Sequence, residues 1–317
     1  MALITAKATG NWSAGSTWDS DPALPASGDT VNCAGYIVTV DQDVTVAQIK
    51  STGAGYFAVS AARTINAAVL SDTGHSGGAV IRCTHATGTV AIIGNVTAGP
   101  NVGMSHSAAG TINVTGNVTG GSGANAYGIN QTSTGTINIT GNLLGGSTSN
   151  CRGVHNNSTG TINVTGNATG GAGTTAFGAF NAGAGTVTVS GDVLSGAGSV
   201  AHGAANNSTG TLTVGGVCYP SANSGAFGLY GTNSGGTTTY KKAVIGGALG
   251  APVGGYVKLV VDATVNYIET VRSDTGAAHK LSNDYPTNAQ VESGVVFNLG
   301  TQTGTYAGGS TVIVIED

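Results

Sequence analysis

Apolar and polar residues alternate along the centre of this chain with a period of two, as in a strand that buries one face. The alternating segment recurs every 25 residues, and each copy opens with a glycine, at Gly110, Gly135, Gly160, Gly185 and Gly210. A shorter copy begins at Gly88. A fixed period of this length predicts structural repeats that bury a common core only by stacking on their neighbours.

Each repeat is expected to contain three short strands separated by turns. The first strand contributes two inward columns, which are Ile112, Ile137, Ile162, Val187 and Leu212, and Val114, Ile139, Val164, Val189 and Val214. The second strand contributes a third inward column of Val118, Leu143, Ala168, Val193 and Cys218. At the turn between these strands, short polar side chains tolerate left-handed backbone and bond locally, so we expect a turn ladder of Asn117, Asn142, Asn167 and Asp192.

The frequent glycines exclude helices, because each glycine costs about 0.8–1 kcal/mol in a helix interior. The sequence therefore predicts an all-β fold, a right-handed parallel β-helix of about 25 residues per coil. We expect four parts: an N-terminal cap or docking segment (1–35), irregular early coils (36–87), regular β-helix repeats (88–235) and a C-terminal β-rich module (236–317).

Charge is rare and unevenly placed. Only 8% of the residues are charged, and between residues 83 and 240 the sequence holds just Arg152 and Asp192. A charge repeated in one column would meet its copy about 4.8 Å away, a repulsion of about 1 kcal/mol in water. The net charge of −4 and the absence of a basic stripe argue against a nucleic-acid partner.

Other features bear on location. No run of 18 apolar residues predicts a membrane span, and the first ten residues lack the apolar core of a secretory signal. Cys151 and Cys218 stand in columns of small or apolar residues, so we expect buried, unpaired thiols and folding in a reducing cytoplasm.

Candidate catalytic groups are few. Parallel β-helices that cleave polysaccharides need paired carboxylates, and the regular repeats offer only Asp192. Asp262, Glu269 and Asp274 lie nearer the C-terminus without a spacing that suggests a pair. The six histidines show no metal-ligand spacing. We expect no enzyme activity, no metal and no cofactor.

Two surface arrays are candidate binding features. One is a grid of outward threonines and asparagines that resembles the threonine grids of ice-binding β-solenoids: Thr111, Asn113, Thr115, Thr136, Asn138, Thr140, Thr161, Asn163 and Thr165. The other is a column that we expect to face outward and to contact a partner, or to cover the bend by aromatic stacking: Tyr127, Arg152, Phe177, His202 and Phe227.

The two ends of the chain carry a resemblance. The pattern of Gly10-Asn11-Trp12, Trp18 and Gly28-Asp29-Thr30-Val31 resembles the opening segment of β-helical surface proteins, found in bacterial adhesins and in tailed-bacteriophage structural proteins. Residues 285–306 look like a C-terminal module of phage virion proteins.

This resemblance implies a virion surface component, either a capsid decoration or a fibre-like protein, that folds in the host cytoplasm. Its expected partners are other virion proteins of the capsid or tail, further copies of itself in a homo-oligomer and a host-surface glycan. A tailspike depolymerase would share the fold, but this chain lacks the paired carboxylates that such an enzyme needs. The alternatives are a bacterial surface adhesin, which would be extracellular or at the cell surface, and an ice-binding protein.

Overall fold

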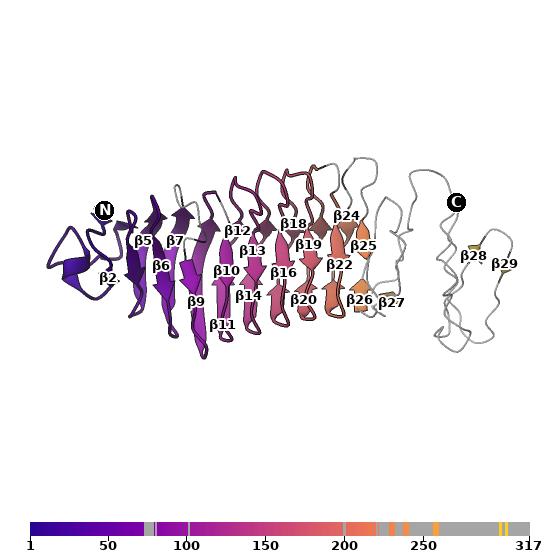
Figure 1. Cartoon of the computed structure of the whole chain (residues 1–317), viewed down its shortest axis with the longest axis horizontal. Helices are drawn as coiled ribbons and strands as arrows, with labels where there is room; N and C mark the ends of the chain where they lie inside the picture. Colours follow the sequence, from indigo (N-terminus) through magenta and orange to yellow (C-terminus); the bar gives the residue numbers. More distant parts are fainter. Residues whose placement is uncertain are drawn as a thin grey trace.

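The computed structural model describes residues 1–72, 79, 81–100, 102–198, 201–219, 221, 228–231, 237–240, 256–259, 298–299 and 302–303. Successive strands follow one another along an elongated stack (Figure 1). Ile112 pairs with Ile137, and Ile137 with Ile162, in parallel register. The structure therefore confirms the predicted all-β fold, a parallel β-helix of about 25 residues per coil.

The larger of its parallel sheets contains 17 strands within the described residues. Its first five strands along the chain are β1 (Leu3–Thr5), β3 (Thr30–Asn32), β5 (Val44–Ser51), β7 (Thr64–Asp72) and β9 (Thr89–Thr97). The first strands of the later coils are β11 (Thr111–Thr115), β14 (Thr136–Thr140), β17 (Thr161–Val164), β20 (Thr186–Val189), β23 (Thr211–Val214), β26 (Thr237–Tyr240) and β27 (Tyr256–Leu259). Their second strands are β12 (Val118–Thr119), β15 (Leu143–Leu144), β18 (Ala168–Thr169), β21 (Val193–Leu194) and β24 (Cys218–Tyr219).

The second parallel sheet takes the third strand of each coil and contains ten described strands. They are β2 (Gly10–Asn11), β4 (Ile37–Thr39), β6 (Tyr56–Val59), β8 (Ile81–Cys83), β10 (Met104–His106), β13 (Ile129–Gln131), β16 (Val154–Asn156), β19 (Ala179–Asn181), β22 (Ala204–Asn206) and β25 (Leu229–Gly231). Each pairs only with the strands of the preceding and following coils. Stability therefore rests on contacts between neighbouring coils.

The core lies between the two sheets and follows the predicted columns. All fifteen residues of the three inward columns are buried, with at most 1% of each exposed. Burying a valine, leucine or isoleucine side chain contributes about 1.5–3 kcal/mol relative to leaving it exposed. The column that ends at Cys218 also confirms the expectation of a buried thiol there, and Cys151 is equally buried and unpaired.

The predicted turn ladder is confirmed, but its hydrogen bonds run between coils. The Asn117 side-chain oxygen accepts the Asn142 backbone N–H at 2.8 Å, and the Asn142 oxygen accepts the Asn167 N–H at 2.9 Å. Positive φ falls on the glycine before the asparagine, at 147° for Gly116. A Cβ there would lie 2.2 Å from the carbonyl oxygen of Gly94, so close approach of two coils also requires glycine.

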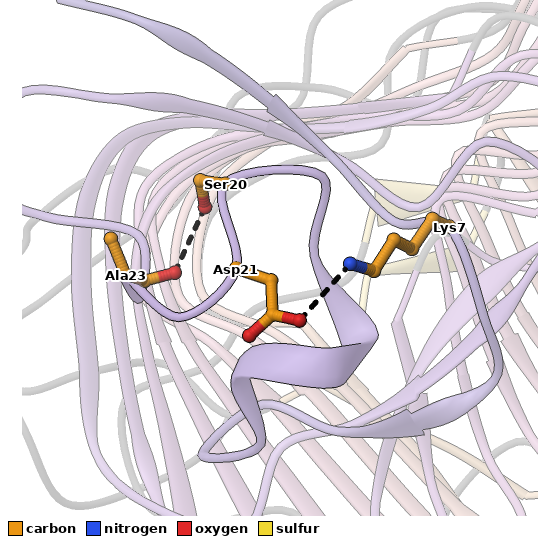
Figure 2. A network of polar contacts seen from close by, with 4 residues as sticks. All are labelled: Lys7, Ser20, Asp21 and Ala23. Carbon is orange, nitrogen blue, oxygen red and sulfur yellow. Dashed lines mark hydrogen bonds and ion pairs between the residues drawn. The ribbon is translucent and has the colours of Figure 1, made fainter.

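The N-terminal segment joins the stack. Strand β1 pairs with β3 and β2 pairs with β4, so both sheets begin within it. Trp12 and Trp18 are buried, with ring centroids 5.1 Å apart, and Trp18 Nε1 donates to the Trp12 carbonyl. The 3₁₀ helix η1 (Gly15–Thr17) lies between them. The adjoining loop is held by the Lys7–Asp21 ion pair of 3.3 Å and by the Ser20 hydroxyl, which donates to the Ala23 carbonyl (Figure 2).

Strand pairing continues beyond residue 235. Strand β26 pairs in parallel with β23, and β27 pairs in parallel with β26. Strands β28 (Asn298–Leu299) and β29 (Gln302–Thr303) pair with each other in antiparallel fashion. Most of the expected C-terminal module lies outside the described residues.

Candidate functional site

The predicted threonine and asparagine grid lies on the outer face of strands β11, β14 and β17. Thr111 pairs with Thr136 and Thr115 with Thr140, so the columns are in register from coil to coil. The column of Thr115, Thr140 and Thr165 is exposed, and that of Thr111, Thr136 and Thr161 is half-buried. The structure thus brings together all nine residues that the sequence assigned to this face.

The middle column of the grid is occupied by its own hydrogen bonds. Asn138 Nδ2 donates to Asn113 Oδ1 at 2.8 Å, and Asn163 Nδ2 donates to Asn138 Oδ1 at 2.9 Å. Amide side chains in a parallel stack can bond in this way because each carries both a donor and an acceptor. These bonds tie the coils together and leave the threonine hydroxyls as the groups that face solvent.

A second surface feature is a ridge of stacked loops, formed by residues 120–127, 145–152 and 170–177, between the second and third strands of successive coils. Ser147 N–H donates to the Gly121 carbonyl at 3.0 Å, and Ala172 N–H donates to the Gly146 carbonyl at 3.0 Å. Gly146 N–H also donates to the carbonyl of Ala126 in the neighbouring loop at 2.7 Å. The loop ridge is therefore a hydrogen-bonded continuation of the stack.

One flank of the loop ridge is an open groove of about 670 Å³ that runs across several coils. Gly120, Gly145 and Gly170 line it together with Leu144, and Leu144 is 43% exposed. A Cβ at Gly145 would lie 2.8 Å from the Arg152 carbonyl carbon, so the packing of the loop accounts for the glycine. The groove residues include no charged side chain.

The opposite flank holds the column that was expected to face outward, and that expectation is wrong. Tyr127, Phe177 and His202 are buried, with at most 8% of each exposed, and Arg152 keeps only partial exposure. Phe227 lies outside the described residues. The physical reason is that the side chains fold onto the outer face of the second sheet, where Phe177 and Tyr127 contact the rings of the column that contains His155 and Phe180.

The ring contacts on this flank are close. The Tyr127 and His155 centroids lie 4.6 Å apart, those of Phe177 and Phe180 lie 4.9 Å apart, and those of Phe177 and His202 lie 5.0 Å apart. The Arg152 guanidinium carbon lies 3.9 Å from the Phe180 ring centroid. We call Tyr127, Arg152, His155, Phe177 and Phe180 the aromatic–arginine cluster. These contacts pack the loop ridge against the outer face of the second sheet.

Burial sets the charge states here. It lowers the pKa of His155 to about 3, with a further contribution from the Arg152 charge, and it lowers the pKa of His202 to about 4. Burial also raises the pKa of Tyr127 and lowers that of Arg152. At neutral pH the cluster therefore contains one neutral imidazole, that of His155, and one cation, that of Arg152.

Sequence reasoning missed a buried column of polar side chains inside the stack, where the third strand turns into the next coil. Gln131 Nε2 donates to the Gly135 carbonyl, Asn156 Nδ2 to that of Gly160, and Asn181 Nδ2 to that of Gly185. The signal was present as an amide residue four positions before Gly135, Gly160, Gly185 and Gly210, whereas His106 holds this position before Gly110. We call Gln131, Asn156, Asn181 and Asn206 the inner amide column.

Within the described residues, no three metal-ligating side chains converge. His85 and His106 stack with centroids 5.5 Å apart, and burial together with the neighbouring His85 lowers the pKa of His106 to about 4. Asp192 lies in the turn ladder, where its oxygen accepts the Val217 N–H. Asp262, Glu269 and Asp274 lie outside the described residues.

Comparisons with known proteins add no relative. No protein-family model, curated protein or solved structure matches this chain. Across the described part of the chain, no helix is long and apolar enough to cross a membrane.

Proposed function

We propose that this protein is a structural component of a virion surface, a capsid-decoration or fibre-like protein that acts as a rigid rod for docking, stabilisation or host attachment. The observation that carries the proposal is the continuous in-register pairing of coils along a shaft that is almost free of charge. Such a stack supplies length and stiffness but few reactive groups. The resemblance of residues 285–306 to a module of phage virion proteins supports the virion as its setting, and the N-terminal pattern is one that phage structural proteins share with bacterial adhesins.

The proposed partners are capsid or tail proteins, further copies of the chain and a host-surface glycan. Quantitative peptide mass spectrometry of purified virus-like particles from the source culture tests the location. We expect its peptides at a fixed copy number per particle, and that number separates a capsid decoration from a tail fibre. Enrichment in the cell-surface fraction alone would overturn the virion proposal in favour of an adhesin. Light-scattering mass after size exclusion tests self-association, and a strict monomer would contradict an oligomeric fibre.

The in-register threonine columns favour ice binding as a second candidate function. Threonine hydroxyls in a regular two-dimensional array can order water, and Thr136 lies at the centre of its column between Thr111 and Thr161. Thermal hysteresis of the purified chain tests this function, with Thr136→Leu as the variant and Thr169→Leu, on the second strand of a coil, as the control. No hysteresis in the native chain would exclude ice binding.

A further inference from the structure

The cation of the aromatic–arginine cluster lies among three rings. The Arg152 guanidinium carbon is 3.9 Å from the Phe180 centroid, 5.3 Å from that of Tyr127 and 5.7 Å from that of Phe177. The electron-rich faces of the rings attract the cation. Ring faces do not replace the strong acceptors that a guanidinium's N–H groups bond in water.

Within the described residues, Arg152 Nε is enclosed and has no hydrogen-bond partner, and no acidic side chain forms an ion pair with the guanidinium. The nearest acidic residue in the sequence is Asp192, whose oxygen is engaged in the turn ladder. A largely buried cation without an anion is costly, so the arrangement indicates that an external anion completes it.

Two further polar atoms beside the cluster lack partners. Asn130 Oδ1 and His155 Nδ1 are enclosed without a hydrogen bond in the described residues, and these two residues are paired on neighbouring strands. The His155 ring contacts Tyr127 and Phe180, which also surround Arg152. The site therefore combines unpaired N–H donors with an amide oxygen that needs a donor.

We propose that Arg152 is the centre of a binding site for the carboxylate of an acidic saccharide. The planar guanidinium matches a carboxylate through two parallel hydrogen bonds. Saccharide hydroxyls are the donors that Asn130 Oδ1 lacks, whereas a phosphate monoester dianion or the carboxylate of an acidic peptide side chain supplies only acceptors. Arg152 and Asn130 both keep partial exposure, so a ligand can approach them from solvent, and the Asn130 amide must turn to present its enclosed Oδ1.

The proposed function includes attachment to a host-surface glycan, and this inference names the chemical class of that glycan. The biological role of the site therefore rests on the proposed function. The binding itself is tested on the purified full chain, with tetragalacturonate as the probe and its methyl ester as the neutral control. Isothermal titration at low salt compares the native chain with Arg152→Gln, Arg152→Lys and Arg82→Gln. Arg82 is a matched control because its guanidinium carbon also lies 3.9 Å from an aromatic centroid, that of Tyr56.

We expect the native chain and Arg82→Gln to bind the acid but not its ester, and Arg152→Gln to bind at least about tenfold more weakly. Arg152→Lys keeps the charge but loses the planar fork, so it should also weaken binding, and it remains informative if Arg152→Gln fails to fold. Equal affinity in the native chain and both Arg152 variants, or no binding by the native chain, would overturn the site.

A glutamate oligopeptide provides the second arm of the test. Arg152-dependent binding of the peptide without binding of galacturonate would assign the site to a protein carboxylate and overturn the saccharide. The particle mass spectrometry involves no saccharide, so failure of this site and failure of the virion proposal are separate results.

Discussion

The inner amide column offers a direct test of what holds successive coils together, and Asn156 is its best-defined member. Its side chain is fully buried and its Nδ2 donates to the Gly160 carbonyl at 3.0 Å, while its Oδ1 accepts the Ser158 backbone N–H at 3.3 Å and the Ser158 hydroxyl at 3.0 Å. Asn156→Ala removes all three bonds, although the Ser158 hydroxyl can still donate to the Ser133 carbonyl. The Gly160 carbonyl keeps the Thr186 N–H at 3.0 Å, so the loss at that oxygen is only partial. At about 0.5–1.5 kcal/mol per bond, we expect the free energy of unfolding to fall by about 2 kcal/mol.

The adjacent residue supplies the control. The Asn157 side chain is exposed and makes no hydrogen bond within the described residues, so Asn157→Ala should change stability by less than about 0.5 kcal/mol. Urea denaturation followed by circular dichroism measures both variants. Because coils of a stack can open locally, amide hydrogen exchange of residues 154–164 gives a second reading. Similar losses in the two variants, or none in Asn156→Ala, would refute the stabilising role of the column.

Three further outcomes are expected. Burial lowers the pKa of His155 to about 3 in the folded chain, whereas an unfolded histidine titrates near 6.5. The unfolded chain therefore binds a proton first as the pH falls below about 6.5, and the free energy of unfolding should decrease by about 1.4 kcal/mol per pH unit. Urea titrations at several pH values should show a shallower decrease in His155→Phe, and an unchanged slope would contradict this. Combining Asn138→Asp with Asn163→Asp sets two carboxylates about 4.8 Å apart, so the double variant should lose about 1–3.5 kcal/mol more than the two single changes together, and less in high salt. The buried thiols of Cys151 and Cys218 should react with a maleimide only after denaturant is added, and rapid labelling of the native chain would argue against their burial.

The sequence contained enough to predict the stack because strand side chains alternate strictly and the repeat keeps one length. Ile112, Ile137 and Ile162 share a face only if the coils are in register, and the structure has them so. The turn ladder was predictable for the same reason, since Asn117 and Asn142 recur at one position of the repeat. Its bonding between coils was not predictable, because that depends on how closely the glycine turns approach.

Other features depend on where the loops fold, which alternation does not specify. Tyr127 and Phe177 lie in loops outside the strands, so their column gave no indication of the face that they would cover. The inner amide column was missed because Asn156 and Asn181 are polar and polar residues were assigned to the outside. Burial is favourable there because the turn supplies a carbonyl for each amide.

The in-register stacking also makes the length of this molecule a stepwise quantity. A coil of 25 residues presents to the next coil the same pairing edge that it receives from the one before. Duplication or deletion of one whole repeat would therefore change the rod by about 4.8 Å and leave every remaining edge with an equivalent neighbour. Insertion of one residue within a strand would instead turn its inward columns to solvent. Mutations that add or remove whole repeats are thus expected to change the length of the rod in steps of one coil and to leave its cross-section unchanged.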